Sequence, residues 1–560
     1  MTPEPERGSP HPQQSALVVH GKMVKGSSIC CGWKRSQTNT PERGLSPPSR
    51  YVPMVALRKG VEPVPGSGLA AAGDSHAPLR FFRMAAPSAA SGKCIMNESD
   101  SLVTSRRDFL KTTGKAAAVS ALAGVSIPHV HAAGSDTIQI ALIGCGGRGG
   151  GAAANALEAK GNQKLVAMAD VFEDKLNTAY QSLHKAHASK VDVPDDRKFI
   201  GFDGYKKAMD CLKPGDVAIF TTPLAFRWVH FTYAIEKNLN VFMEKPLTAD
   251  GPSSRRMLDL AQKASAKNLK VGVGLMSRHS RAMQELQNRI QDGEIGDVVL
   301  LRGYRMHEPV ASAFSEKWPG HPSELLWQIR RFHSFLWASG GCFNDFYIHH
   351  IDHLCWMKNA WPINAQALGG RHYRTSSSGV HWIDQNFDSY SVEYTFADGT
   401  KFIMDGRCMY GCKDIYHSYA HGTKGSAVVS KNGDCGLPSS TFKSQKPESG
   451  SLVWTSKVKQ GETDPYLNEW NDLLEAVRND KPYSEVKRGV EASIVCNMGR
   501  MAAHTGQEIS FEDMLNSDHE FAPGVDKWTM DSPPPLKSDS EGRYPVPMPG
   551  KNKMREYGLA

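Results

Sequence analysis

Three glycines with the spacing Gly144-x-Gly146-x-x-Gly149 follow an apolar segment and precede an Ala-rich one. In a strand–turn–helix unit the first glycine allows a tight turn, the second lets the backbone approach a pyrophosphate, and the third packs helix against strand. The helix N-terminus adds N–H donors and the positive end of its dipole. The loop, which also contains Cys145, Gly147 and Arg148, is therefore predicted to bind a dinucleotide.

An acidic residue stands where this type of site needs one. Asp170 follows the glycine loop by about twenty residues and ends a second apolar segment. A carboxylate there accepts hydrogen bonds from the adenosine ribose hydroxyls and repels a 2′-phosphate, which favours NAD over NADP. Arg148 could instead lie near a phosphate, so the sequence leaves NADP open as an alternative.

Two short motifs close later apolar segments. Thr222-Pro223 follows one of them, with His230 on the next helical stretch, and Glu244-Lys245-Pro246 follows another. Ligands of open parallel sheets bind at the carboxyl ends of the strands, so both motifs are expected to face the nucleotide. Each motif alone could also be an ordinary turn, because proline commonly follows a strand.

A second group of reactive side chains follows Gly340-Gly341. Asp345, His349 and Asp352 are spaced by four and three residues, which places them on one helical face. A carboxylate that orients an imidazole is a suitable arrangement for a general base. Two alternatives remain: His349 and His353 could bind a metal, although no third ligand is evident, or the polar residues could satisfy a buried helix start.

Aromatic and cationic residues precede this helix and could contact a substrate. They suit the faces and hydroxyl groups of a sugar, although some of the tryptophans could belong to the core. They are Trp327, Gln328, Arg330, Arg331 and Trp337.

The elements that must position these residues fall into two patterns. Apolar segments at 138–143, 165–169, 217–221 and 240–243 alternate with helical stretches, which predicts an α/β, doubly wound parallel sheet over residues 134–270. Residues 271–515 are predicted to form an α+β domain with a mostly antiparallel open sheet, and residues 516–560 an extended tail. The strands expected in the α+β domain are 298–305, 388–396, 401–405 and 425–430, with a hairpin turn at 397–400. The helices expected there are 466–478 and 490–504.

The N-terminal part of the chain has the pattern of an export signal. Residues 1–95 lack periodicity and are expected to be disordered, and translation could begin at Met96. Ser105-Arg106-Arg107-Asp108-Phe109-Leu110-Lys111, a short apolar segment and Val130-His131-Ala132 predict a twin-arginine signal peptide over 96–133. We therefore expect export by the twin-arginine translocase to the periplasm or medium, without a stable membrane anchor.

The charge distribution and the cysteine content argue against a nucleic-acid-binding protein and against a disulfide-stabilised one. The net charge of +8 resides in residues 1–132, and the remainder carries equal numbers of acidic and basic residues, so nothing favours nucleic acid as a partner. The 11 cysteines are scattered, which indicates buried free thiols rather than a disulfide framework. Cys408 and Cys412 are the one close pair.

Taken together, the motifs resemble the glucose–fructose oxidoreductase/inositol dehydrogenase/rhizopine-catabolism (Gfo/Idh/MocA) family over about residues 137–515. The resemblance rests on the glycine loop, Thr222-Pro223, Glu244-Lys245-Pro246 and Asp345-x-x-x-His349-x-x-Asp352, and extends to 421–425 and 498–502. With the signal peptide, the chain resembles a secreted branch of that family.

The resemblance implies a Rossmann domain, a second domain whose open sheet often mediates homo-oligomers, and hydride exchange between a nicotinamide and a sugar or cyclitol carbon. It implies that Lys245 contacts the nicotinamide ribose and the substrate, and that Asp345 and His349 are the acid–base pair. Tyr347 stands where many members have glycine, so we expect it to reshape the substrate pocket.

These inferences predict an NAD(P)-dependent oxidoreductase acting on CH–OH groups of a sugar, cyclitol or sugar derivative. Because free NAD is scarce outside the cytoplasm, we expect the cofactor to be held tightly and its hydride to be returned within the cycle. The alternatives are an NAD-dependent redox-assisted glycosidase, a sugar lyase or epimerase, and a non-enzymatic sugar-binding or sensor protein.

Overall fold

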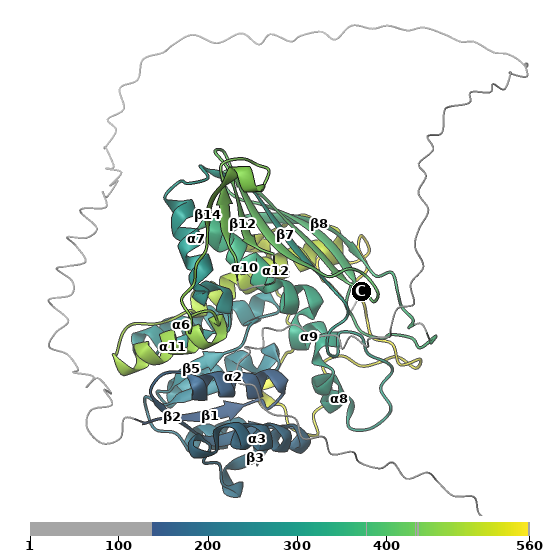
Figure 1. Cartoon of the computed structure of the whole chain (residues 1–560). Helices are drawn as coiled ribbons and strands as arrows, with labels where there is room; N and C mark the ends of the chain where they lie inside the picture. Colours follow the sequence, from purple (N-terminus) through teal and green to yellow (C-terminus); the bar gives the residue numbers. More distant parts are fainter. Residues whose placement is uncertain (1–136, 377, 432, 434–435, 558–560) are drawn as a thin grey trace, which may run out of the picture. The chain divides into compact units, whose positions relative to one another are not determined.

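The computed structural model describes residues 137–557 except 377, 432, 434 and 435, and these residues build two β-sheets (Figure 1). The predicted disordered extension and the twin-arginine signal peptide lie outside the described residues. The α/β class with one parallel and one mostly antiparallel sheet is confirmed.

The first sheet is parallel and has the strand order β3-β2-β1-β4-β5-β6. The order reverses between β1 and β4, and ligands of such sheets bind at that point. The strands are β1 Thr137–Ile143, β2 Asn162–Asp170, β3 Lys198–Ile200, β4 Val217–Phe220, β5 Asn240–Met243 and β6 Val271–Val273. Strand β6 begins one residue after the predicted boundary at residue 270 and belongs to this sheet.

Helices cover both faces of this sheet, which is why its central strands are almost continuously apolar. The helices between the strands are α2 Gly147–Glu158, α3 Glu173–His187, α4 Gly204–Asp210, α5 Arg227–Glu236 and α6 Gly251–Ala266. A late helix, α11 Pro465–Arg478, returns to the sheet, and its Trp470 stacks on Phe242 with 4.4 Å between the ring centroids. The first domain is thus completed by residues from the far end of the chain.

The second sheet has nine strands in the order β14-β13-β12-β11-β7-β10-β9-β8-β15. Its strands pair antiparallel except for β7 with β10, which are parallel. The predicted hairpin at 397–400 joins β9 to β10. The strands are β7 Val298–His307, β8 Asn364–Gly370, β9 Ser389–Thr395, β10 Lys401–Cys408, β11 Ile415–Gly422, β12 Ser426–Ser430, β13 Ser440–Phe442, β14 Leu452–Thr455 and β15 Ile509–Ser510.

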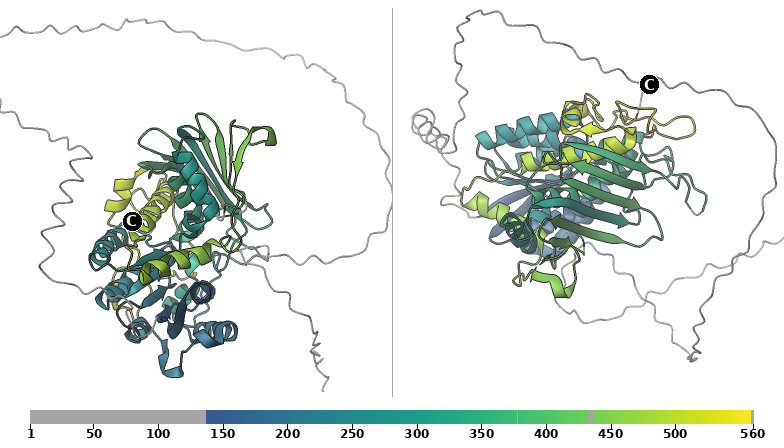
Figure 2. Two further views of the ribbon diagram at one scale, coloured as in Figure 1. Left: turned by 60° about the vertical axis from the view of Figure 1, so that its left-hand side comes forward. Right: turned by 90° about the horizontal axis from the view of Figure 1, so that it is seen from above.

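Two long helices, α10 Gly341–Lys358 and α12 Val486–Thr505, pack against one face of the second sheet (Figure 2). Both are buried along most of their length, because they lie between this sheet and the first domain. Alternate residues of β10 on the opposite face are only partly buried. The helices α7 Arg281–Gln291 and α13 Phe511–Asn516 complete this domain.

A segment between β7 and α10 and the C-terminal residues pack against each other. The segment contains α8 Glu324–Arg330, η5 Phe332–Ser334 and α9 Leu336–Ser339. Tyr544 donates a hydrogen bond to Glu324 (2.6 Å), and Gln328 donates one to the carbonyl of Leu536 (2.7 Å). The predicted tail is therefore irregular but docked, and its Glu556 is 2% exposed.

No helix in the described part of the chain has both the length and the apolar character needed to span a bilayer. The seven cysteines there are all free, Cys408 and Cys412 included.

Candidate functional site

The glycine loop has the geometry that a pyrophosphate cradle requires. Gly144 has φ +95°, and a Cβ atom there would lie 2.7 Å from the backbone nitrogen of Thr222. A Cβ on Gly149 would lie 2.0 Å from the carbonyl oxygen of Gly144, so only glycine allows α2 to pack this closely. Gly146 and Gly147 have open space in front of them. Helix α2 begins at Gly147, so its N-terminal amides belong to the cradle.

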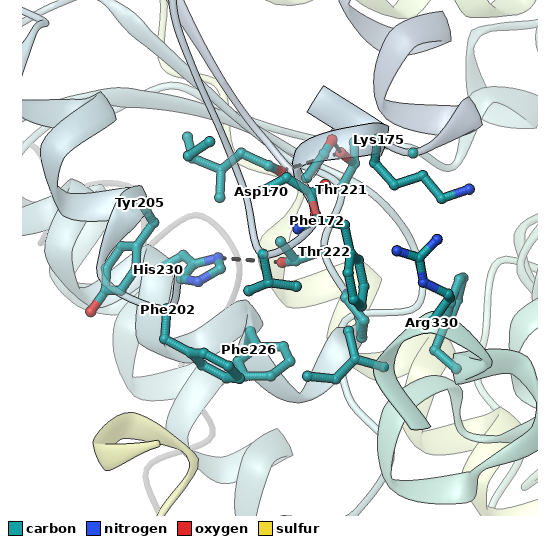
Figure 3. Close-up of a pocket in the computed structure, with 18 of the residues that line it drawn as sticks. Asp170, Phe172, Lys175, Phe202, Tyr205, Thr221, Thr222, Phe226, His230 and Arg330 are labelled. Carbon is teal, nitrogen blue, oxygen red and sulfur yellow. Dashed lines mark hydrogen bonds between the residues drawn. The ribbon is translucent and has the colours of Figure 1, made fainter. Parts of the chain in front are cut away.

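The cradle opens into a cavity of about 330 Å³ at the carboxyl ends of the parallel strands (Figure 3). One side carries Lys175, Phe172 and Arg330, and the other Tyr205 and His230. The lining includes Gly144, Gly146, Gly147, Asp170, Phe172, Lys175, Phe202, Tyr205, Thr222, Pro223, His230, Ser312, Arg330 and His333. These residues fit a dinucleotide, because they combine amide donors, a carboxylate and aromatic surfaces in one enclosure.

Asp170 is held in a fixed orientation at the end of β2. Its carboxylate accepts hydrogen bonds from the backbone N–H groups of Cys145 (2.6 Å) and Phe172 (2.9 Å). Burial raises the pKa of Asp170, and these two hydrogen bonds act in the opposite direction. Lys175 lines the same cavity and was not recognised in the sequence.

Arg148 and Glu244 are engaged with each other. Arg148 Nε donates to Glu244 at 2.6 Å, its Nη2 lies 3.7 Å from Glu469, and its guanidinium carbon lies 4.8 Å above the Tyr466 ring. Burial opposes the charge on Arg148, but the two glutamates outweigh it and raise its pKa. Neither Arg148 nor Glu244 lines the cavity, and Lys245 does not line it either, so their contact with the cofactor stays a prediction.

The loop after β5 meets helix α10 through Lys245. Lys245 Nζ donates to the backbone carbonyl of Asp345 at 2.6 Å and lies 3.4 Å from its Oδ1 atom. His349 follows one helical turn later and is 7% exposed. The structure thus brings two of the three predicted catalytic residues into contact and places the third on the same helix.

Three residues predicted to belong to the catalytic or substrate site lie in the core. Tyr347 is fully buried, with Gly406 directly against its ring, and a bulky side chain is accommodated there without reaching the cavity. Asp352 is fully buried and pairs with Arg278 at 2.7 Å. Trp327 packs against Phe335 and Tyr544.

Arg330 lines the cavity, but at the side where Asp170 lies. It makes two hydrogen bonds to Asp174, of 2.9 and 2.8 Å, and its guanidinium carbon lies 4.1 Å above the Phe172 ring. Its place therefore favours contact with a nucleotide over contact with a substrate. Of the other aromatic and cationic candidates, Gln328, Arg331 and Trp337 do not line the cavity.

His333 was missed in the sequence. Its ring lines the cavity, its Nδ1 atom lies 2.9 Å from Ser312 Oγ, and its Nε2 atom lies 3.5 Å from Asp345 Oδ2. Nothing in the spacing indicates it, because the segment that carries it has no periodic relation to α10. In the described residues no group of three or more His, Cys, Asp or Glu side chains is arranged to bind a metal.

Comparison with known proteins gives the family of this part of the chain. Residues 138–289 match the model of the Gfo/Idh/MocA group, described as "Oxidoreductase family, NAD-binding Rossmann fold". This region is therefore similar to the NAD-binding domains of that group. The match includes β1 to β6, the glycine loop and Lys245, and it makes the cradle an NAD site.

Several curated proteins that this chain is similar to are inositol dehydrogenases. Inositol 2-dehydrogenase of Corynebacterium glutamicum is 30% identical over 101 residues, which is 18% of this chain and 29% of that protein. The matched region thus spans less than a third of that relative. Inositol 2-dehydrogenase 3 of Saccharopolyspora erythraea is 25% identical over 285 residues, 50% of this chain and 72% of that protein.

Solved structures share the fold. A levoglucosan dehydrogenase in complex with NADH and levoglucosan aligns with a TM-score of 0.52 and 16% identity over 67% of this chain and 99% of its own. The aldose-aldose oxidoreductase of Caulobacter crescentus, complexed with glycerol, aligns with a TM-score of 0.50 and 14% identity over 67% and 99% of the two chains. At these identities the likeness establishes the two-sheet architecture.

Proposed function

We propose that this protein is an NAD-dependent oxidoreductase that exchanges hydride between a nicotinamide and a CH–OH carbon of a sugar, a cyclitol or a derivative of either. The observation that carries the proposal is the contact of Lys245 with Asp345, which joins the end of a cofactor-domain strand to helix α10 of the second domain. A bound NAD would supply the hydride acceptor. The names of the relatives, inositol and levoglucosan dehydrogenases, support the substrate class.

The chain's own residues provide the proton chemistry. Loss of hydride from a carbinol carbon turns the hydroxyl into a carbonyl, so its proton must leave with the hydride. His349 accepts this proton, and Asp345 orients the imidazole ring of His349. The ammonium group of Lys245 stabilises the charge that develops on the substrate oxygen. Burial of His349 and Asp345 keeps water from competing.

We also propose that the cofactor is held through many turnovers. Arg330 of α8 reaches across to Asp174 and Phe172 of the cofactor domain, and the C-terminal residues pack on α8 from the other side. A nucleotide in the cavity would thus be enclosed by a segment that is itself fixed. Retention suits the export predicted from the twin-arginine signal, because the protein would carry its NAD out of the cytoplasm.

The partly open face of the second sheet supports a further part of this proposal, a homo-oligomer joined through that face. Leu368 of β8 is 78% exposed, although it lies on a strand. Light scattering of the purified protein gives the mass in solution. A monomer at micromolar concentration contradicts the oligomer and leaves the proposed reaction untouched.

Turnover assays with two variants test the proposed function. The full-length protein is purified, a denatured sample is analysed for nicotinamide nucleotide, and the native protein is assayed against inositols, aldoses and anhydrosugars with an artificial hydride acceptor. We expect His349→Ala and Lys245→Ala to lower kcat by about 10²- to 10⁴-fold while the nucleotide content of His349→Ala is unchanged. Lys263→Ala, an exposed lysine on α6, is the control.

Full activity in His349→Ala contradicts the proposed mechanism. Release of a free sugar from an aryl glycoside without net NADH formation points instead to a redox-assisted glycosidase. Unchanged kcat in both variants, together with altered sugar affinity, points to a binding protein.

A further inference from the structure

We propose that His333 is a positioning residue of the acid–base site: its ring donates a hydrogen bond from Nε2 to Asp345, and the hydroxyl group of Ser312 donates one to the other ring nitrogen. The inference rests on the proposed function, because Asp345 is the carboxylate that orients the acid–base pair. His333 lies in the segment between β7 and α10, outside the motifs by which the family is recognised.

The two carboxylate oxygens of Asp345 are approached by different groups. Lys245 Nζ lies 3.4 Å from Oδ1, and His333 Nε2 lies 3.5 Å from Oδ2. Two partners on two oxygens define the plane of the carboxylate, whereas Lys245 alone would leave it free to rotate. Hydrogen bonds of catalytic groups are often long before the substrate is bound and shorten in the complex.

The protonation of the ring follows from its surroundings. Burial lowers the pKa of His333 and outweighs the opposite effect of Asp345, while Lys245 lowers it further. The ring is therefore neutral and carries one proton. Nε2 lies 3.5 Å from a carboxylate oxygen of Asp345, which can accept this proton in a hydrogen bond, so Nε2 is the protonated nitrogen in the proposed arrangement. Nδ1 then accepts a hydrogen bond from the Ser312 hydroxyl, whose oxygen lies 2.9 Å away.

The backbone of His333 is tied to the helix that carries Asp345. The side-chain amide of Asn386 donates to the His333 carbonyl (2.9 Å), and its oxygen accepts from the backbone N–H of Cys342 at the start of α10 (2.9 Å). The His333 ring also stacks on Phe346, the neighbour of Asp345, with 5.7 Å between centroids and 16° between planes. Asn386 is fully buried, so this link is shielded from water.

The place of His333 explains why it would matter. Its ring lines the cofactor cavity, whereas Asp345 does not. His333 thus lies at the edge of the cofactor cavity that is nearest to Asp345, with its Nε2 atom 3.5 Å from the carboxylate. The other groups that Asp345 faces in the described structure are Lys245 from the loop after β5 and the more distant Arg227 from α5, with His349 one turn further along α10.

The test compares two replacements of similar size. In His333→Gln the amide nitrogen can take the place of Nε2 and still donate to Asp345, whereas in His333→Leu nothing donates. For His333→Leu we expect kcat to fall at least about tenfold and the acidic limb of its pH profile to move up by about one to two pH units, because a donor to a charged acceptor is lost. His333→Gln should restore the wild-type acidic limb and most of kcat, and Ser312→Ala should fall between the two. KM should change less than about threefold in all of them, because none of these groups is assigned to substrate binding. His333 and Ser312 line the cofactor cavity, so the nucleotide content of each variant is measured and kcat is expressed per bound nucleotide.

Each outcome decides one question. A wild-type acidic limb in His333→Leu, or equal losses in the Leu and Gln variants with parallel losses of stability, overturns the positioning role. If the wild-type protein has no turnover, the proposed function fails. The protonation state and tautomer of the His333 ring can then still be measured by long-range ¹⁵N NMR of the full-length protein with labelled histidine. With the His333 signal assigned by its loss in His333→Gln, a neutral Nε2–H tautomer near pH 7 supports the inference, and an imidazolium or an Nδ1–H tautomer contradicts it.

Discussion

At the scale of single residues, we expect Asp170 to determine whether the cavity prefers NAD or NADP. Its carboxylate is fixed by two backbone amides, and it shares the cavity with Lys175. Asp170 was predictable because its distance from the glycine loop is a property of the local strand–turn–helix–strand unit. Lys175 was not, because its relevance depends on the direction in which α3 leaves β2.

We expect Asp170→Ser to lower the preference for NAD over NADP at least about tenfold. Tenfold corresponds to only about 1.4 kcal/mol, whereas two like charges about 4 Å apart near a protein surface repel by about 4 kcal/mol. Affinities of the two nucleotides are measured by calorimetry on protein stripped of cofactor. Adding Lys175→Ala should remove the gain for NADP, and Asp259→Ser, an exposed aspartate on α6, should change neither affinity. An unchanged preference in Asp170→Ser means that the ribose lies elsewhere.

The sequence did not reveal the surroundings of Asp352 or the place of His333, and the physical reason is the same for both. Asp352 has the spacing of a site residue, but the sequence does not show that Arg278, 74 residues earlier, neutralises it in the core. His333 has no informative spacing, yet it reaches Asp345 because Asn386 ties its segment to α10. Local patterns identify which side chains share a face, and tertiary packing decides what that face meets.

At the scale of elements, the buried parallel strands were predicted because they are continuously apolar, whereas β6 was missed because it has three residues. Strand β11 was missed because its sequence, Ile-Tyr-His-Ser-Tyr-Ala-His-Gly, mixes polar and aromatic residues. One of its faces is only partly buried, so the usual apolar alternation is weak.

The contact between α3 and α8 should control cofactor release. Its ion pair is partly exposed, with side-chain exposures of 37% for Arg330 and 59% for Asp174, and such pairs contribute about 0.2–1 kcal/mol. We therefore expect Asp174→Ala to accelerate nucleotide release about two- to fivefold, and Arg330→Ala somewhat more because it also loses the contact with Phe172. Dilution of the loaded protein into a nucleotide-scavenging assay measures the rate of nucleotide release.

The double reversal Arg330→Asp with Asp174→Arg should recover part of the loss, and Lys237→Ala, from a similar surface pair with Asp210, should have no effect. Equal release rates in all variants would remove this contact from the account.

A buried histidine links α11 to the start of α12 and should make stability depend on pH. His279 Nδ1 lies 2.7 Å from Asp472 and Nε2 lies 3.0 Å from Glu485. Burial opposes its charge, but Glu485 and Asp472 outweigh burial and raise the pKa of His279 to about 9. Because the pKa of His279 is higher in the folded than in the unfolded protein, its charge stabilises the folded state. This contribution is complete below the unfolded pKa of about 6.5 and is lost as the pH rises towards 9.

We therefore expect the wild-type protein to lose on the order of 2 kcal/mol of unfolding free energy between pH 6.5 and 9, relative to His279→Gln. Urea unfolding at the two pH values measures the difference. His184→Gln, at an exposed position of α3, should keep the wild-type dependence. Parallel pH curves for wild type and His279→Gln would show that the histidine does not carry this charge.

At the scale of the whole molecule, the C-terminal residues secure both segments that carry the proposed catalytic groups. Glu556 accepts hydrogen bonds from Arg500 (2.7 and 2.8 Å) and from His504 (2.7 Å). Arg500 in turn donates to the carbonyls of Ala249, in the loop that follows Lys245, and Gly340, just before α10. Burial opposes the charge on Glu556, but Arg500 and His504 outweigh it and lower the pKa of Glu556 to about 2.

We expect Glu556→Ala to destabilise the protein by about 3–5 kcal/mol at pH 7, because it leaves the buried Arg500 unpaired. Because the pKa of Glu556 is lower in the folded than in the unfolded protein, its charge stabilises the folded state. This contribution is complete above the unfolded pKa of about 4.5 and fades as the pH falls towards 2. Urea unfolding at pH 7 and pH 3.5 should therefore show a smaller effect of the substitution at the lower pH. Glu541→Ala, an exposed glutamate of the same tail, is the control. A loss below about 1 kcal/mol at pH 7 would mean that the tail is dispensable.

The central claim is that NAD in this cavity exchanges hydride with a polyol under the control of residues from the second domain. The most direct measurement mixes the purified, nucleotide-loaded, full-length protein with inositols, aldoses or anhydrosugars in a stopped-flow instrument and follows absorbance at 340 nm. We predict a single-turnover rise equivalent to about one NADH per bound NAD with at least one of these compounds, and none with His349→Ala carrying the same amount of nucleotide. Protein that binds no nicotinamide nucleotide, or a His349→Ala variant that gives the same burst as the wild type, would contradict the account.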